Sequence, residues 1–118
     1  SFCGRWRKGQ MRKFYSLLGL CKRSGNLEAG ETAAEQAVRK KNAELLILAG
    51  DASANTKKKF RNSAAYYGIA LVEAGNKEEL GRAIGTEQRS IIAVTEKGFA
   101  EKLKTLAGEN IKEFDTRD

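Results

Sequence analysis

ELLILA, residues 44–49, is the stretch that decides the fold class of this 118-residue chain. The apolar residues from Leu45 to Ala49 follow one another without alternation, which is typical of a central strand covered on both faces. The run is far too short to cross a bilayer, which takes about 20 apolar residues. The turn at residues 50–53 (GDAS) comes next, with Asp51 or Ser53 as the candidate N-cap of a helix. We therefore expect a buried strand that leads directly into a helix.

Helical and extended patterns alternate on both sides of this strand. Phe14, Leu18 and Cys21 recur at helical spacing, and Asn76 is the candidate N-cap of a later helix. We expect helices over residues 11–24, 30–41, 53–67, 76–84 and around 99–106, an extended link over 25–29, and further strands over 69–73 and 90–95. This alternation predicts an α/β domain, with a mixed or parallel sheet and helices on both of its faces.

Two segments flank the domain, which we place at residues 11–108. Residues 1–10 (SFCGRWRKGQ) are basic but unpatterned, and they lack the apolar core of a secretory signal. We interpret them as an extension added in front of Met11; the alternative is a basic arm whose Trp6 touches nucleic acid. Residues 109–118 (ENIKEFDTRD) are predicted to form a polar C-terminal tail.

The composition argues against catalysis. The chain has no histidine, which removes the commonest general base and the commonest metal ligand. It has no glycine-rich phosphate loop, and its acidic residues are scattered along predicted helices. The two cysteines, Cys3 and Cys21, show no metal-binding spacing, and we interpret them as reduced thiols of a cytoplasmic protein. We expect no enzymatic activity, no cofactor and no metal.

Positive charge is concentrated in the first half of the chain. The formal net charge is +7, from 22 basic and 15 acidic residues. Residues 1–62 hold 14 basic and 5 acidic side chains, whereas residues 63–118 hold 8 basic and 10 acidic ones. A one-sided excess of this kind suggests a surface for a polyanion, although basic charge alone is not specific.

Two basic runs are candidate contacts for such a partner. Lys57, Lys58, Lys59 and Arg61 open a predicted helix, where the helix dipole disfavours cations. Phosphate contact and an ordinary solvated surface both remain open for this run. Residues 39–41 (RKK) end a predicted helix, where the dipole alone accounts for them.

The predicted helix that begins at Gly30 is a further candidate. Backbone N–H groups at a helix start can receive phosphate or base acceptors. Glu31, Thr32 and Gln36 fall on the first turns and carry groups suited to base edges. On composition alone, ordinary polarity of a helix N-terminus is the better explanation of these residues.

Several segments match a known family in order: residues 18–30 (LGLCKRSGNLEAG), 43–49 (AELLILA), 51–58 (DASANTKK), 80–85 (LGRAIG) and 91–95 (IIAVT). Together they resemble the kink-turn-binding ribosomal proteins of the L7Ae type, most closely the bacterial YlxQ-like branch. The resemblance covers residues 11–107. It implies a three-layer α/β/α sandwich, with a mixed central sheet of about four strands, that binds RNA bent by tandem G·A pairs.

The resemblance also implies where RNA is recognised. In the family, a glycine at the start of the second helix is followed by threonine, asparagine and glutamate and, a turn later, by lysine. Gly30 matches the glycine. The other four positions hold Glu31, Thr32, Ala33 and Gln36, in that order. Thr32 can still hydrogen-bond to a base, whereas Ala33 cannot.

The loop before the last strand is the family's other contact. It corresponds here to residues 85–90 (GTEQRS), and it is polar, whereas it is often apolar in the family. Arg89 is its candidate phosphate or base contact.

The leading hypothesis is an RNA-binding accessory protein of the translation apparatus. Its partner would be structured, kink-turn-like RNA, ribosomal or other non-coding. The candidate RNA-binding residues are Lys22, Gly30, Glu31, Thr32, Gln36, Arg39, Lys40, Lys57, Lys58 and Arg89. The alternative is a protein-interaction module with the same fold that has lost specific RNA recognition.

Overall fold

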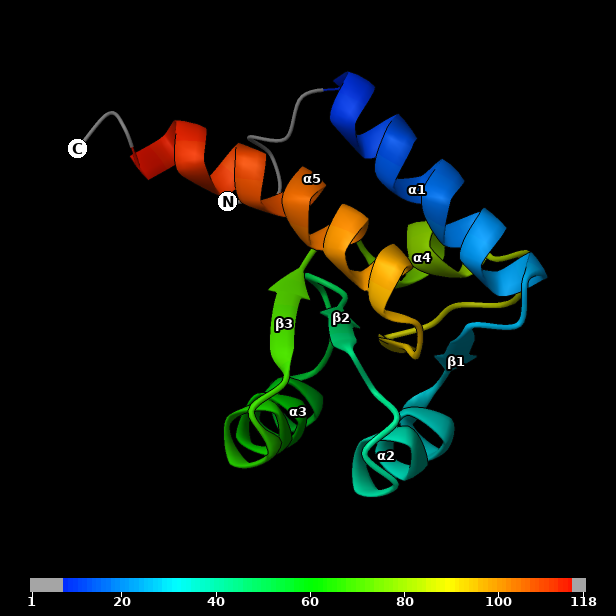
Figure 1. The fold of residues 1–118 in the computed structure, drawn as a ribbon, viewed down its shortest axis with the longest axis vertical. Helices are drawn as coiled ribbons and strands as arrows, with labels where there is room; N and C mark the ends of the chain where they lie inside the picture. The colour runs from blue at the N-terminus through cyan, green and yellow to red at the C-terminus, as the bar shows by residue number, and fades with distance from the viewer. Residues whose placement is uncertain (1–7, 116–118) are drawn as a thin grey trace.

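Four strands form one mixed sheet with helices on both faces (Figure 1). The structure, a computed structural model, describes residues 8–115. The strands are β1 (Leu27–Ala29), β2 (Leu45–Leu48), β3 (Ala70–Glu73) and β4 (Ile91–Val94), in the sheet order β1-β4-β2-β3. Strand β2 runs parallel to β3, whereas β4 is antiparallel to both β1 and β2. The predicted α/β sandwich with a mixed sheet of about four strands is confirmed.

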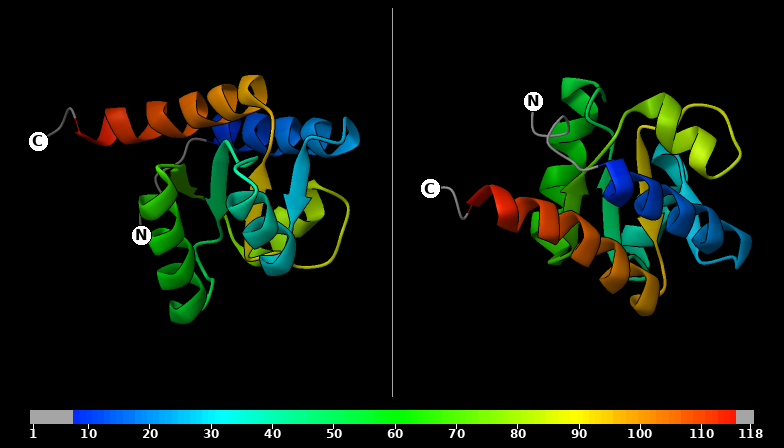
Figure 2. Two further views of the ribbon diagram at one scale, coloured as in Figure 1. Left: turned by 60° about the horizontal axis from the view of Figure 1, so that its bottom comes forward. Right: turned by 90° about the horizontal axis from the view of Figure 1, so that it is seen from above.

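The helices divide between the two faces of the sheet (Figure 2). One layer holds α1 (Lys8–Arg23) and α5 (Lys97–Asp115), with α4 (Lys77–Ala83) packed against α1. The other layer holds α2 (Glu31–Arg39), which packs on β1 and β4, and α3 (Ala54–Tyr67), which packs on β2 and β3. None of the helices in the part of the chain that the structure describes is both long and apolar enough to span a membrane.

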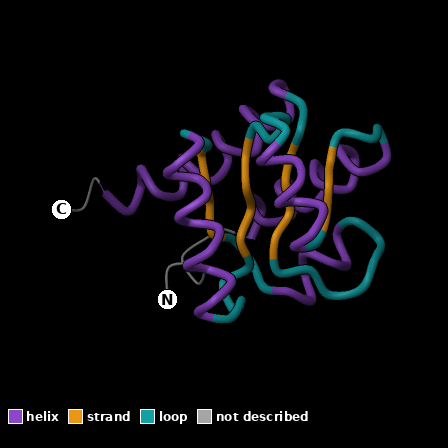
Figure 3. Tube along the Cα trace, turned by 90° about the horizontal axis from the view of Figure 1, so that it is seen from below, coloured by secondary structure: helices purple, strands orange, loops and turns teal. Residues whose placement is uncertain are grey.

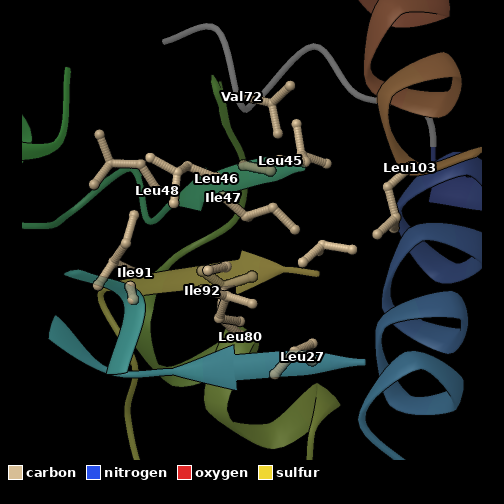
Figure 4. Packing of buried hydrophobic residues seen from close by; sticks show 14 of the residues in the cluster. Leu27, Leu45, Leu46, Ile47, Leu48, Val72, Leu80, Ile91, Ile92 and Leu103 are labelled. Atoms are coloured by element: carbon tan, nitrogen blue, oxygen red, sulfur yellow. The ribbon is translucent and has the colours of Figure 1, made fainter. Parts of the chain in front are cut away.

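The two central strands are buried along their whole length. Every residue of β2 and of β4 is inaccessible to solvent, as the unbroken apolar run in β2 predicts. Figure 4 shows Ile47 and Ile92 among the side chains of this core, with Leu103 of α5 and Leu80 of α4 packed from the helical layer. The sheet core therefore supplies a rigid platform for the loops at its ends.

Helix ends follow the local sequence. The Ser53 hydroxyl accepts the N–H of Thr56 at 3.1 Å and so caps α3. The other candidate cap, Asp51, instead accepts the N–H of Lys77 at 2.8 Å. The Asn76 side chain caps α4 by accepting an N–H at 2.8 Å, as predicted.

Three boundaries differ from those expected. The predicted extended link over 25–29 contains a true edge strand, because residues 27–29 pair with β4. Helix α1 begins at Lys8 and α5 continues to Asp115, so both enter segments that the sequence places outside the domain. The expectations for Cys3, Trp6 and residues 116–118 lie outside the described residues.

Candidate nucleic-acid interface

The strands lie side by side with loops and helix ends at both ends of the sheet (Figure 3). At one of these ends, α2, α3 and α4 begin near the loop that precedes β4. The Gly30 N–H donates to the carbonyl of Ile91 at 3.0 Å, and the Ala49 N–H donates to the carbonyl of Ser90 at 2.9 Å. These bonds tie the starts of α2 and α3 to the first residues of β4. We call this region, formed by residues 30–32, 51–58 and 85–90, the helix-start edge.

Gly30 shapes the start of α2. Its φ of +99° lies in the left-handed region, where any residue with a side chain would be strained. No side chain caps this helix, and the Gly30 N–H is already used by β4. The next three N–H groups, those of residues 31–33, have no acceptor within the helix. These N–H groups point away from the helix, at the positive end of its dipole. A phosphate or a base acceptor could bind there.

The carboxylate of Glu31 is linked to the neighbouring helix. The Thr56 hydroxyl donates to Glu31 Oε2 at 2.8 Å, and the Ser53 hydroxyl donates to Thr56 Oγ1 at 3.0 Å. Thr56 is also the one buried polar side chain among the described residues. Glu31 therefore joins α2 to α3, a role that sequence reasoning missed because the partners lie 25 positions apart.

Thr32 and Gln36 lie on one exposed face of α2. They are four residues apart, and Lys40 follows after another four, so the three side chains form a stripe along the helix. Gln36 and Lys40 also line a shallow hollow of about 320 Å³ with Glu28 of β1. The structure thus places the two candidate base contacts next to each other and beside the open N–H groups.

The basic residues of α3 differ in their partners. The Glu73 carboxylate at the end of β3 holds both Lys57, at 3.5 Å, and Arg61, at 2.7 Å. Lys59 pairs with Glu35 of α2 at 3.4 Å. Lys58 is exposed and forms no ion pair with the described part of the chain. Of this run, Lys58 is therefore the cation most available for a phosphate.

The loop over residues 85–90 is anchored on α4. The Thr86 N–H donates to the carbonyl of Gly81 at 2.8 Å, and the Arg89 N–H donates to the carbonyl of Lys77 at 3.1 Å. Glycine at position 81 allows the loop to pack closely on α4, because a methyl group there would collide with the backbone carbonyl of Glu87. The Nε of Arg89 is buried and has no hydrogen-bond partner within residues 8–115. The loop is thus held by its backbone, with Arg89 at the helix-start edge.

The remaining candidates lie away from this edge. Lys22 is exposed in the last turn of α1, and the chain then enters the opposite end of the sheet at Leu27, which pairs with the last residue of β4. Arg39 ends α2 and pairs with Glu35 at 3.4 Å. The ten predicted residues therefore do not form one patch. Gly30, Glu31, Thr32, Lys57, Lys58 and Arg89 lie at the helix-start edge, and Gln36 lies one turn further along α2. Lys22, Arg39 and Lys40 lie toward the far end.

The part of the chain that is described holds no cluster of metal-ligating side chains beside these residues. No three His, Cys, Asp or Glu side chains come together there to hold a metal ion. The Cys21 thiol is buried, and burial with the nearby Glu96 carboxylate raises its pKa to about 11. This thiol stays protonated near neutral pH and is unreactive.

Residues 12–104 match one protein family, described as the ribosomal protein L7Ae/L30e/S12e/Gadd45 family. The chain is 38% identical over 94 residues to the RNA-binding protein YlxQ of Bacillus subtilis (strain 168), a match that covers 80% of this chain and 94% of the relative. It is 34% identical over 99 residues to a protein of the same name from Enterococcus faecium, covering 84% and 95% of the two chains.

Two solved structures share the fold. A protein of unknown function from Bacillus halodurans C superposes with a TM-score of 0.79 at 41% identity, covering 81% of this chain and 97% of the other. A 15.5kD RNA binding protein of Giardia lamblia superposes with a TM-score of 0.66, covering 98% of this chain and 96% of the other. The latter is only 18% identical, so it speaks for the fold alone.

Proposed function

Since this chain belongs to the ribosomal protein L7Ae/L30e/S12e/Gadd45 family, we propose that it binds RNA through the helix-start edge. The curated relatives from Bacillus subtilis and Enterococcus faecium are named RNA-binding proteins. Family membership and these names support RNA binding as the function of this chain. The family is a non-enzymatic one, and nothing in the composition calls for catalysis.

The observation that carries the proposal is the uncapped start of α2 beside the anchored loop over residues 85–90. Three outward N–H groups and a left-handed Gly30 lie next to this loop, because the Gly30 N–H donates to the carbonyl of Ile91, two residues after Arg89. RNA-binding proteins recognise distorted or unstacked parts of an RNA, because the deep major groove of A-form RNA is closed to side chains. A sharply bent element such as a kink-turn offers the exposed base edges and close phosphates that this edge suits.

We assign the individual contacts by chemistry. Thr32 and Gln36 carry neutral donors and acceptors that suit base edges, so they would provide discrimination between RNAs. Lys58 and Arg89 at this edge, and Lys40 at the far end of α2, would contact phosphates and provide affinity that falls with salt. Glu31 would act indirectly, by fixing α2 against α3 through Thr56.

The biological setting that we propose is the translation apparatus in the cytoplasm. Support comes from the description of the family, which names ribosomal proteins. The ligand would then be a structured segment of ribosomal or another non-coding RNA.

A salt-titrated binding assay tests the proposal. The RNAs are a kink-turn stem and a plain duplex of equal length. Tighter binding to the kink-turn stem that persists at high salt is the expected result, and Gln36→Ala should reduce that preference. Equal binding that collapses with salt would leave only a basic surface. Absence of binding to both RNAs would favour a protein-interaction module with this fold.

A further inference from the structure

Helices α2 and α3 lie side by side on the same face of the sheet and begin at the same edge (Figures 1 and 2). Their first turns are joined by the Glu31–Thr56 hydrogen bond at 2.8 Å, and their middles by the Glu35–Lys59 ion pair at 3.4 Å. The helices therefore form one continuous surface that leads from the helix-start edge to the opposite end of the sheet.

An aromatic pair stands at that opposite end. Tyr66 is 83% exposed and Tyr67 is 39% exposed, in the last turn of α3. The two ring centroids are 5.0 Å apart and the ring planes are inclined by 80°. In this edge-to-face contact, most of the Tyr66 ring stays exposed to water. The core does not use Tyr66, so its packing does not explain an aromatic residue there.

One basic residue that follows α2, Lys41, lies beside Tyr67. Tyr67 lines a shallow hollow of about 330 Å³ with Lys41 and Glu44. Lys41 has a φ of +61°, and among the residues described it alone adopts a positive φ without being glycine. This left-handed turn follows directly after Arg39 and Lys40, so three consecutive cations lie at the end of α2. Glu44 lies beside Lys41 in the hollow and Arg39 pairs with Glu35, so Lys40 leaves the end of α2 with one positive charge in excess.

We propose that Tyr66 and Tyr67, with Lys41, form a stacking site for an unpaired nucleotide of RNA whose folded part occupies the helix-start edge. The inference rests on the proposed function and extends its ligand from a bent stem to a stem with a single-stranded flank. An exposed aromatic ring stacks on any base, and a nearby lysine attracts the adjoining phosphate. A ring beside cations fits nucleic acid better than an apolar protein anchor, which would be set in an apolar pocket.

The test compares a blunt kink-turn stem with the same stem carrying a short unpaired oligouridine flank at either end, and with the free oligouridine. The native chain should bind one of the flanked stems about tenfold more tightly than the blunt stem. Tyr66→Ala should abolish this gain and leave the affinity for the blunt stem unchanged, whereas Tyr66→Phe, which keeps the ring, should retain the gain.

Leu20→Ala is the matched control, because Leu20 is 49% exposed on α1, in the opposite layer. It should change none of the affinities. A native chain that gains nothing from either flank, or a Tyr66→Ala variant that weakens blunt and flanked stems equally, would overturn the stacking site. Binding of the free oligouridine distinguishes failure of the stacking site from failure of the proposed function. If the blunt stem does not bind but the oligouridine binds in a Tyr66-dependent manner, the proposed function fails and the stacking site stands.

Discussion

The hydroxyl of Thr56 donates a hydrogen bond to the carboxylate of Glu31 at 2.8 Å, and this contact joins the first turns of two neighbouring helices. Thr56 is buried and its hydroxyl also accepts from Ser53, so the cap of α3 and the start of α2 belong to one network. The position of the helix start that we assign to RNA therefore depends on a residue outside that helix.

The first prediction concerns this network. Thr56→Val keeps the shape of the side chain but removes the hydroxyl that serves Ser53 and Glu31. We expect the free energy of unfolding to fall by about 1–2 kcal/mol, because a charged acceptor loses its donor. Urea denaturation measures this change. Thr105→Val, at an exposed position on α5, is the control and should have no comparable effect.

Charge at the helix start gives a second prediction. Glu31→Gln keeps an oxygen that can accept from Thr56 but removes a negative charge from the surface assigned to RNA. Affinity for RNA should rise about twofold to fivefold at low ionic strength, and the difference should shrink as salt screens the charge. A loss of affinity would mean that the carboxylate itself contacts the RNA. Glu101→Gln, on α5, corrects for the change in net charge.

The third prediction separates two neighbouring lysines. Lys57 is held by Glu73 at 3.5 Å, whereas Lys58 has no ion pair in the described part of the chain. Lys58→Ala should weaken binding to all RNAs alike and lower the slope of log affinity against log salt by about one. Lys57→Ala should have a smaller effect on both quantities, and Lys104→Ala on α5 should have none. Equal losses for Lys57 and Lys58 would contradict the role given to Glu73.

The fourth prediction concerns the packing of the loop over residues 85–90 on α4. A methyl group on Gly81 would collide with the carbonyl of Glu87, so Gly81→Ala must displace either the loop or α4. We expect a loss of roughly 1–3 kcal/mol in the free energy of unfolding, as for other overpacked sites. Gly9→Ala is the matched control, because Gly9 is helical and has open space around it. Thermal denaturation should show no loss of stability for Gly9→Ala.

The fifth prediction concerns how Glu96, at the start of α5, affects stability in acid. The Glu96 carboxylate accepts the backbone N–H of Phe99 at 2.8 Å and that of Gly98, and these bonds lower its pKa below the ordinary value of 4.5. The contribution of the Glu96 carboxylate to the free energy of unfolding is therefore complete above about pH 4.5. It is lost as the pH falls through the lower pKa of the folded state. Unfolding measured against pH should show a shallower acid decline for Glu96→Gln than for the native chain. Identical acid declines would show that this cap contributes nothing.

Much of the fold was predictable because its signals are local. The apolar run in β2 predicts a doubly covered strand, and Ser53 and Asn76 cap the helices that their positions indicate. The family resemblance is likewise confirmed. Strand β1 was predicted only as an extended link, because three residues become a strand only through pairing with β4.

The candidate site was less predictable because its contacts join distant parts of the chain. Glu73 of β3 pairs with both Lys57 and Arg61 of α3, and no local pattern in either segment indicates this pairing. Burial of the Thr56 hydroxyl between α3 and Glu31 is equally invisible in the sequence. The assignment of individual residues to RNA stays a prediction, and it depends on such tertiary pairs as much as on residue type.

The most direct test of the central claim is an NMR titration of the native chain with a kink-turn stem, followed through the backbone amide signals. Our account predicts that the amides of residues 30–33 and of the loop over 85–90 shift most, because the open N–H groups of α2 meet the RNA there. The amides of α1 and α5 should stay nearly unchanged. Shifts concentrated on α1 and α5, with residues 30–33 unaffected, would contradict the assignment of RNA to the helix-start edge.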